Sequence, residues 1–112
     1  MERLRQRADF LAAARAIKVP AQGFVLQARP RGDQGPVRVG FTVSRKVGNA
    51  VERNRVRRRL REVVRLAGPA NLARGHDYVL VGRRPALALP FARIMTDFEG
   101  AAKRIQPNKS SR

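Results

Sequence analysis

The 112-residue sequence contains no cysteine and no tryptophan, and it has a single histidine. Without cysteine it forms neither a disulfide nor a thiolate metal site. No run of about 18 uncharged apolar residues is present, so we expect no membrane span. The first ten residues, MERLRQRADF, are charged from the second position and lack the apolar stretch of a secretory signal. These absences favour a cytoplasmic protein.

Acidic residues are also scarce. Eight Asp and Glu stand against 25 Lys and Arg, which gives a formal net charge of +17 and a pI near 12.0. A folded domain with this much charge of one sign repels itself and is most stable against a polyanion. Nucleic acid is the commonest such partner, because neutralised phosphates release counterions. An anionic membrane surface is the rival, but neither a basic helix with large apolar residues opposite nor a lipidation signal is evident.

Hydrophobic patterns predict one domain over residues 1–112, with flexible ends at 1–6 and 106–112. Apolar residues make up 43% of the chain and aromatics only 5%, so we expect a core of Val, Leu, Ile and Ala. The expected elements are a short helix over 8–17, an extended piece near Lys18, strands over 24–29, 37–44 and 77–82, a basic helix over 50–67, and a last helix over 90–105.

Two expectations concern the strands. Segments 24–29 and 37–44 are separated by PRGDQGP, a loop rich in Gly and Pro, so we expect them to pair as an antiparallel hairpin. Segment 77–82 is nearly all apolar, which is typical of a strand covered on both faces.

The basic helix has two distinct sides. Asn49 is a suitable N-cap, and Gly68-Pro69 is expected to end the helix. At roughly 100° per residue, one side gathers an apolar stripe. The stripe consists of Val56, Leu60, Val63 and Ala67. The opposite side carries Asn54, Arg58, Arg61 and Arg65, flanked by Arg55, Arg57 and Arg59.

A charge run usually means a solvated helix face held by ion pairs between residues four apart. Here residues 45–65 contain nine basic residues and only two acidic ones, Glu52 and Glu62, so most arginines lack a local partner. The pattern therefore favours a polyanion-binding surface. Asn54 remains open: it is either a tolerated surface residue or an amide that binds a base, a ribose or a metal-bound water.

Residues for protein-based catalysis are missing. The acidic residues are scattered, and His76 beside Asp77 is expected to be a surface loop residue. A nuclease acting through its own side chains needs carboxylate clusters, histidines or a metal site. We therefore expect no catalytic and no metal-ligating residue in the polypeptide.

One segment is recognisable. VSRKVGNAVERNRVRRRLRE, residues 43–62, resembles the signature of the bacterial ribonuclease P protein subunit, whose central mark is an Arg-Asn-Arg triplet. The triplet here is Arg53, Asn54 and Arg55. The resemblance covers nearly the whole chain, because an early RLxxxxDF pattern, the strand motifs FVL and VRVGFTVS, and DYVLVGRRP also match.

The resemblance implies a fold: an α+β two-layer sandwich with an about four-stranded mixed sheet and three helices, in the order α-β-β-β-α-β-α. This fold is like the second domain of ribosomal protein S5. It includes a left-handed βαβ crossover through the basic helix, although right-handed crossovers are the strong default.

The resemblance also implies a function. The family's protein binds a catalytic RNA and the 5′ leader of precursor tRNA, and it assists the endonucleolytic removal of the leader that gives mature tRNA 5′ ends. The RNA performs the hydrolysis with Mg²⁺ that it binds mainly itself. We expect a monomer with one copy per RNA.

The expected contacts follow from the matched motif and the helix. The RNA-binding residues are Arg45, Lys46, Arg53, Asn54, Arg55, Arg57, Arg58, Arg61 and Arg65. The leader cleft would contain Phe10 and Gln27. Relatives often carry further cleft aromatics where this chain has Ala14 and Gln27, so leader contacts here would rest more on Arg and backbone than on base stacking.

Two other classes remain to be weighed. A ribosomal or other structural RNA-binding protein is the alternative, since composition does not separate it from a ribonuclease P subunit, whereas the motif does. A DNA-binding domain with a basic recognition helix is disfavoured, because no helix-turn-helix spacing or dimer zipper is evident.

Overall fold

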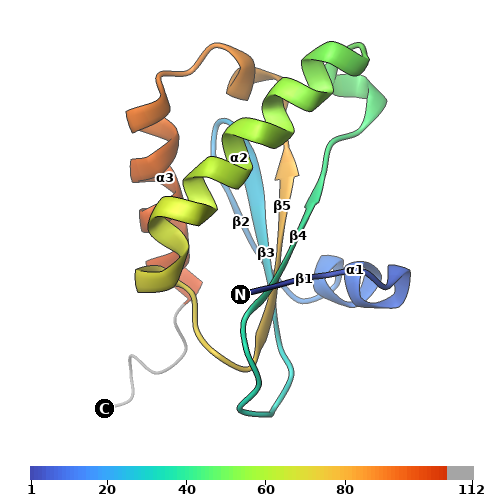
Figure 1. Ribbon diagram of the computed structural model, residues 1–112, viewed down its shortest axis with the longest axis vertical. Helices are drawn as coiled ribbons and strands as arrows, with labels where there is room; N and C mark the ends of the chain where they lie inside the picture. Colours follow the sequence, from blue (N-terminus) through green and yellow to red (C-terminus); the bar gives the residue numbers. More distant parts are fainter. Residues whose placement is uncertain (106–112) are drawn as a thin grey trace.

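The structure, a computed structural model, describes residues 1–105. Its five strands form one mixed sheet in the order β1-β4-β5-β3-β2 (Figure 1). The elements are β1 (Glu2–Arg3), α1 (Arg7–Ala14), β2 (Ile17–Pro20), β3 (Phe24–Pro30), β4 (Arg38–Thr42), η1 (Arg45–Val47), α2 (Ala50–Asn71), β5 (His76–Gly82), η2 (Arg84–Leu87) and α3 (Phe91–Ile105). The predicted α+β class is confirmed, with one strand more than expected.

Strand β5 lies at the centre of the sheet, parallel to β4 and antiparallel to β3. Its residues Tyr78, Val79 and Leu80 are buried, as its apolar sequence predicts. The predicted hairpin between segments 24–29 and 37–44 is wrong, because β5 lies between β3 and β4 and pairs with both. An apolar strand buries most surface at the centre of a sheet, whereas the hairpin would have left β5 at an edge.

The connection from β4 to β5 is a left-handed crossover. In Figure 1 both strands run upwards, α2 crosses in front of the sheet, and β5 lies to the left of β4. This is the handedness that the family resemblance implies and that general packing preferences disfavour.

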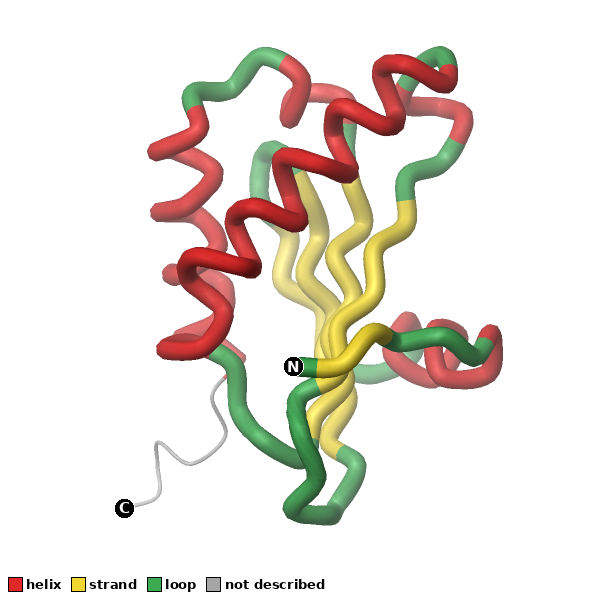
Figure 2. Tube along the Cα trace, in the orientation of Figure 1, coloured by secondary structure: helices red, strands yellow, loops and turns green. Residues whose placement is uncertain are grey.

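Helices cover the two faces of the sheet unequally. Helices α2 and α3 pack on one face, and α1 packs on part of the other (Figure 2). The predicted apolar stripe of α2 is confirmed, since all four of its residues are buried in the main core. The sheet contributes Phe24, Leu26, Tyr78 and Leu80 to that core, and α3 contributes Ile94, Phe98 and Ala102.

Helix α2 begins where predicted and ends later. The side chain of Asn49 accepts a hydrogen bond from the N–H of Glu52 (2.8 Å), and the Glu52 carboxylate accepts one from the N–H of Asn49 (3.0 Å). This capping box satisfies two N–H groups at the helix start. The predicted end at Gly68-Pro69 is wrong: Pro69 removes one N–H near the C-terminus, and the helix continues to Asn71.

Residues 1–6, expected to be flexible, are placed against the sheet. The N–H groups of Glu2 and Leu4 donate to the carbonyl oxygens of Val37 (2.8 Å) and Val39 (2.9 Å), which makes β1 a parallel edge strand. Leu4 is 3% exposed, so its side chain anchors the segment by apolar burial. The other expected flexible end, 106–112, lies outside the described residues.

The first helix is shorter than predicted. It ends at Ala14, and Ile17, expected on its buried face, begins β2 and is 40% exposed. The chain instead gains the backbone pairing of Ile17 to Pro20 with β3. Phe10 and Ala13 remain on the face of α1 that contacts the sheet, as predicted.

His76 is also misplaced by the sequence pattern, which predicts a surface loop residue. It is the first residue of β5 and only 9% exposed. Its ring stacks on Tyr78, with 5.8 Å between centroids, and its Nδ1 lies 2.9 Å from the carbonyl oxygen of Arg74. Burial raises the pKa of Tyr78, whose hydroxyl oxygen accepts a hydrogen bond from the N–H of Ala73. The contacts of His76 are therefore those of a packed core residue.

A buried ionic cluster joins three strands. The carboxylate of Asp77 on β5 is fully buried; it accepts hydrogen bonds from Arg31 (2.8 Å) and, through both oxygens, from Arg38 on β4 (2.8 Å each). Arg29 on β3 lies 3.6 Å from it. Burial alone would raise the pKa of Asp77, but the hydrogen bonds from Arg38 and Arg31 outweigh burial and lower it.

The same cluster attaches α1. Asp9, in the first turn of α1, forms ion pairs with Arg29 (3.2 Å) and Arg38 (3.6 Å). Because Arg29 and Arg38 are also the cross-strand neighbours of Asp77, one cluster fixes the spacing of three strands and the position of a helix.

We predict that Asp77→Asn lowers the free energy of unfolding by about 3 kcal/mol at neutral pH, because it leaves arginines without their buried partner. This is the lower end of the range for breaking a buried ion pair, since Arg29 and Arg38 keep contact with water. Chemical denaturation of both proteins measures the difference.

The pH dependence gives a second readout. The lowered pKa of Asp77 means that its contribution is complete above the unfolded value of about 4 and is lost as the pH falls through the folded value. Wild-type stability should therefore fall more steeply below about pH 4 than that of Asp77→Asn. If the stability of the two proteins fell equally with decreasing pH, the proposed contribution of ionised Asp77 would be contradicted.

Candidate nucleic-acid interface

The arginines of α2 fall into two groups, and the first group is held by the protein itself. Arg59 donates three hydrogen bonds to the carbonyl oxygens of Ala86 (2.9 Å), Leu87 (3.2 Å) and Leu89 (2.7 Å). These bonds fasten α2 to the segment that follows β5. Arg53 donates to the carbonyl oxygen of Gly48 (2.8 Å), which fixes the turn before the helix.

Arg57 and Arg65 have local partners on the helix surface. Arg57 donates to the side-chain oxygen of Asn54 (3.1 Å), and Arg65 forms an ion pair with Glu62. The side-chain oxygen of Asn54 therefore has an intramolecular partner, but the residue is exposed. Its amide nitrogen is accessible from solvent. Hydrogen bonding by Arg65 lowers the pKa of Glu62, which keeps that carboxylate ionised at neutral pH.

The second group is open. Arg55 and Arg58 are exposed, and neither has a hydrogen bond or ion pair to any residue in the described part of the chain. Arg45 and Lys46, on η1 just before the helix, are exposed in the same way. Arg61 is exposed too, with its guanidinium 5.8 Å from the ring centroid of Phe41. The predicted outward side of the helix is thus present, with unneutralised cations on it.

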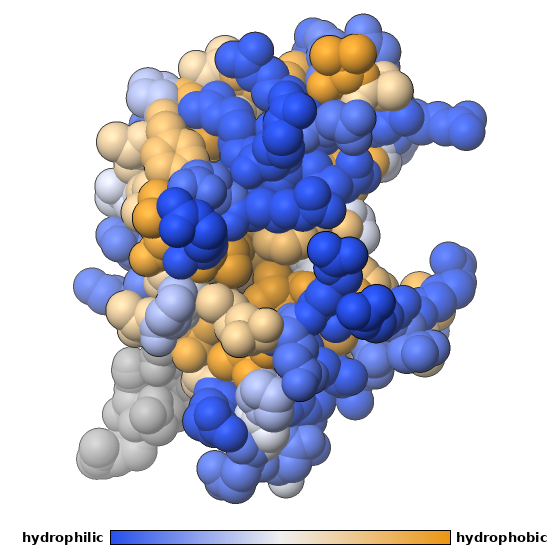
Figure 3. Space-filling view, viewed as in Figure 1, coloured by the Kyte–Doolittle hydropathy of each residue, from blue (hydrophilic) through white to orange (hydrophobic). Residues whose placement is uncertain are grey.

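The surface view shows how these residues gather. In Figure 3 the outer side of α2 is a nearly continuous hydrophilic band across the upper part of the molecule. Below it lies a recess with an apolar floor, bounded on its other side by more hydrophilic residues. The band and recess are neighbours, so one ligand can touch both.

The predicted set omits Arg83 and Arg84, and Arg84 contacts η1. Arg84, after β5, donates to the carbonyl oxygen of Val47 (2.5 Å) and forms an ion pair with Glu52 (3.4 Å). Arg83 donates to the carbonyl oxygen of Ala21 (3.1 Å) and is exposed. The Arg-Arg-Pro sequence at the exit of β5 was the available signal, but only the fold brings it beside η1.

The predicted leader-cleft residues lie on one face of the sheet but differ in accessibility. The Phe10 ring lies directly on β4, since a Cβ built on Gly40 would be 2.5 Å from the ring. Gln27, on β3, packs beside Val79 on the same face but is 9% exposed. Phe10 therefore presents a surface to a ligand, whereas Gln27 offers little.

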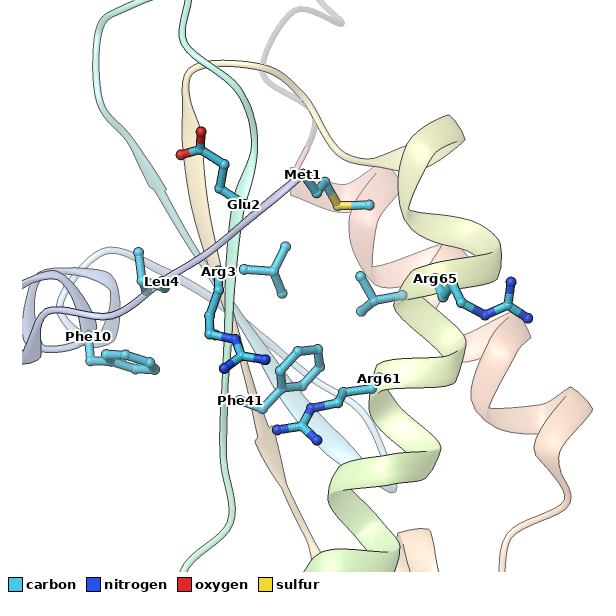
Figure 4. Close-up of a pocket in the computed structure, with 11 residues that line it drawn as sticks. Met1, Glu2, Arg3, Leu4, Phe10, Phe41, Arg61 and Arg65 are labelled. Atoms are coloured by element: carbon cyan, nitrogen blue, oxygen red, sulfur yellow. The ribbon is translucent and has the colours of Figure 1, made fainter.

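A pocket of about 310 Å³ lies between β1, β4 and α2 (Figure 4). Phe10 closes one side, and Phe41 and Arg61 close the other. The remaining lining residues are Met1, Glu2, Arg3, Leu4, Val39, Gly40, Val64 and Arg65. This pocket corresponds to the recess below the basic band.

Most of the acidic residues form ion pairs with arginine. Six of the eight, all within residues 1–105, form ion pairs with arginine: Asp9, Asp33, Glu52, Glu62, Asp77 and Asp97. No group of three or more His, Asp or Glu residues there could hold a metal ion. No helix within residues 1–105 is long and apolar enough to cross a membrane.

Sequence comparison gives a consistent set of relatives. A family model described as Ribonuclease P matches residues 1–106. The ribonuclease P protein component of Paramagnetospirillum magneticum is 47% identical over 110 residues, covering 94% of this chain and 83% of the relative. That of Gluconacetobacter diazotrophicus is 52% identical over 96 residues, covering 85% and 83%.

Solved structures agree in fold. The ribonuclease P protein of Thermotoga maritima superposes with a TM-score of 0.78 at 30% identity, covering 95% of this chain and 99% of that one. The protein from Staphylococcus aureus gives 0.77 at 28% identity, covering 95% and 96%.

We predict that Arg55→Ala and Arg58→Ala each weaken RNA binding and lower the slope of log affinity against log salt by about one, because each removes an unpaired phosphate partner. Filter binding or anisotropy over a range of salt concentrations measures the slope.

Arg59→Ala is the matched control in the same helix. It loses three hydrogen bonds to backbone carbonyls, so it should lower the free energy of unfolding by about 2 kcal/mol and leave the salt slope nearly unchanged. Equal slope changes in all three variants would contradict the division of the arginines.

Proposed function

The chain belongs to the ribonuclease P protein family, and from that premise we propose that it binds the catalytic RNA of ribonuclease P and the 5′ leader of precursor tRNA. In this role it assists the endonucleolytic removal of the leader. The observation that carries the proposal is the outward side of α2, where Arg55, Arg58 and Arg61 have no acidic partner.

Unpaired guanidiniums are suited to phosphate. Each presents a planar fork of donors that matches phosphate oxygens. Spaced three residues apart, slightly less than one helical turn, on a well-packed helix, they form a preorganised row that gains counterion release without reordering the protein. Arg45 and Lys46 extend this row beyond the N-terminus of the helix.

We assign the row on α2 to the catalytic RNA and the sheet face beside Phe10 to the leader. The two surfaces meet at the edge of β4, so a single protein can hold the catalytic RNA and the substrate together. Arg83 and Arg84, which follow β5, add positive charge at that end of the sheet.

The chemistry in this proposal belongs to the RNA. Six of the eight carboxylates are paired with arginines, so we assign Mg²⁺ mainly to the RNA subunit. The protein contributes positive charge that lets RNA segments approach one another with fewer bound cations. A monomer with one copy per RNA suffices for this role.

A structural RNA-binding protein, such as a ribosomal protein, would use the same kind of basic helix. The two functions differ in what the protein does to cleavage. A ribosomal protein has no effect on the reaction of a ribonuclease P RNA, whereas a subunit changes its dependence on Mg²⁺ and on the leader.

The test is reconstitution with the matching RNA subunit and a precursor tRNA. We expect no cleavage by the protein alone and restored cleavage at a Mg²⁺ concentration where the RNA alone is slow. Arg55→Ala combined with Arg58→Ala should require more Mg²⁺ or more protein for the same rate. Absence of any effect of the wild-type protein on the RNA would sink the proposal.

A further inference from the structure

The outer edge of β4 is only partly covered. Strand β1 pairs with Arg38 and Val39, and the carbonyl oxygens of Val37 and Val39 accept hydrogen bonds from β1 and its following residue. Because N–H and C=O groups alternate sides along a strand, those of Phe41 point to the same edge, beyond the end of β1. No backbone partner for them is found within residues 1–105.

Aromatic surface and positive charge meet at this open edge. The Phe41 ring is half-buried, and the guanidinium of Arg61 lies 5.8 Å from its centroid. Figure 4 shows Arg3 and Arg61 directed from opposite elements toward the opening beside Phe41, while Arg65 points away. Arg3 is exposed and has no ion pair among the described residues.

The pocket is small and combines an aromatic ring with guanidinium groups. A volume of about 310 Å³ lies at the lower end of the range of small-ligand pockets, roughly 300–1,000 Å³. Unpaired bases bind on aromatic rings and guanidinium planes and read backbone groups with their edges. Stacked duplex bases cannot enter such a pocket, because their faces are covered.

On the basis of the proposed function, we propose that this pocket binds one unpaired ribonucleotide of the RNA. Its base lies against Phe41 and Arg61, its edge meets the free N–H and C=O of Phe41, and its phosphate lies at Arg3. The site gives the chain an aromatic base platform on the opposite face of the sheet from Phe10 and Gln27.

The net charge of the pocket supports RNA as the occupant. Arg3, Arg61 and Arg65 line it, and Glu2 is its only acidic residue. An apolar peptide segment would leave at least two guanidiniums desolvated against apolar surface, which is costly. A phosphate beside a stacked base satisfies both the charges and the ring.

The test uses two pairs of variants of the full chain. Phe41→Leu removes the ring and keeps an apolar side chain; its control is Phe91→Leu on α3, a half-buried Phe outside the pocket. Arg3→Gln removes the phosphate partner; its control is Arg5→Gln, an exposed residue that does not line the pocket. Circular dichroism checks folding, and Arg3→Gln stands alone if Phe41→Leu does not fold.

Affinity for a short single-stranded oligoribonucleotide is measured at several salt concentrations. We expect Phe41→Leu to weaken binding about tenfold, the effect of losing one stacked base, and Phe91→Leu to have no effect. Arg3→Gln should lower the salt slope by about one, and Arg5→Gln should leave it unchanged. Equal effects within each pair would overturn the proposal.

Amide NMR shifts locate the ligand. The oligoribonucleotide should move the amide signals of Gly40 and Phe41, and inorganic phosphate alone should not. The same shifts with phosphate alone would mean an anion site without base binding, which contradicts the proposal.

If the wild-type protein restores cleavage while Phe41→Leu and Arg3→Gln bind like wild type, this inference fails and the proposed function stands. If the wild-type protein has no effect on the catalytic RNA, the proposed function fails first.

Discussion

The buried carboxylate of Asp77 solves a problem that the rest of the chain creates. Three arginines, Arg29, Arg31 and Arg38, come from β3, the segment after it and β4, and would repel one another without a negative charge between them. Placing the carboxylate on the central strand lets one residue hold both neighbours in register. Because Asp9 pairs with two of these arginines, Arg29 and Arg38, the position of α1 depends on this cluster as well.

Glu52 occupies a similar junction. Glu52 accepts the N–H of Asn49 at the start of α2 and pairs with Arg84 from the far side of β5, and these two bonds lower the pKa of Glu52. Asp9, Asp77 and Glu52 thus lie where elements meet, whereas Glu62 and Asp97 pair with arginines of their own helices. On the outside of α2, Arg55 and Arg58 have no acidic partner among the described residues, and they form part of the candidate binding surface. Arg58 and Arg59 differ within one helix: they are adjacent in sequence, but a rotation of about 100° turns one to solvent and the other to three carbonyl groups.

What the sequence predicts well is local. The cap at Asn49, the apolar stripe from Val56 to Ala67 and the opposite basic side follow from spacing along one helix, which no distant residue can change. Strand order is different, because alternation in segment 37–44 indicates a strand but not its neighbours. Segment 1–6 shows no strand pattern, because only two of its residues pair with β4. Leu4 is buried against Ala13 and Val79, which come together only in the folded protein. The burial of His76 also depends on the folded sheet, because its ring stacks on Tyr78 of the central strand β5.

The candidate site also contains residues that local sequence predicts and residues that it does not. The open arginines of α2 could be predicted, but Phe41 could not, because its alternation with Val39 and Val43 assigns it to the buried face. It is half-buried, and β1, whose last pair joins Arg3 to Val39, ends two residues before it on the neighbouring edge. An uncovered strand edge invites pairing with another chain, and proteins commonly protect such edges with charge. Arg3 and Arg61 provide that protection here, and the same two charges make the edge attractive to a polyanion. A feature that prevents aggregation of the free protein therefore also prepares it to bind RNA, because repulsion between chains of net charge +17 and attraction to phosphate arise from the same guanidiniums.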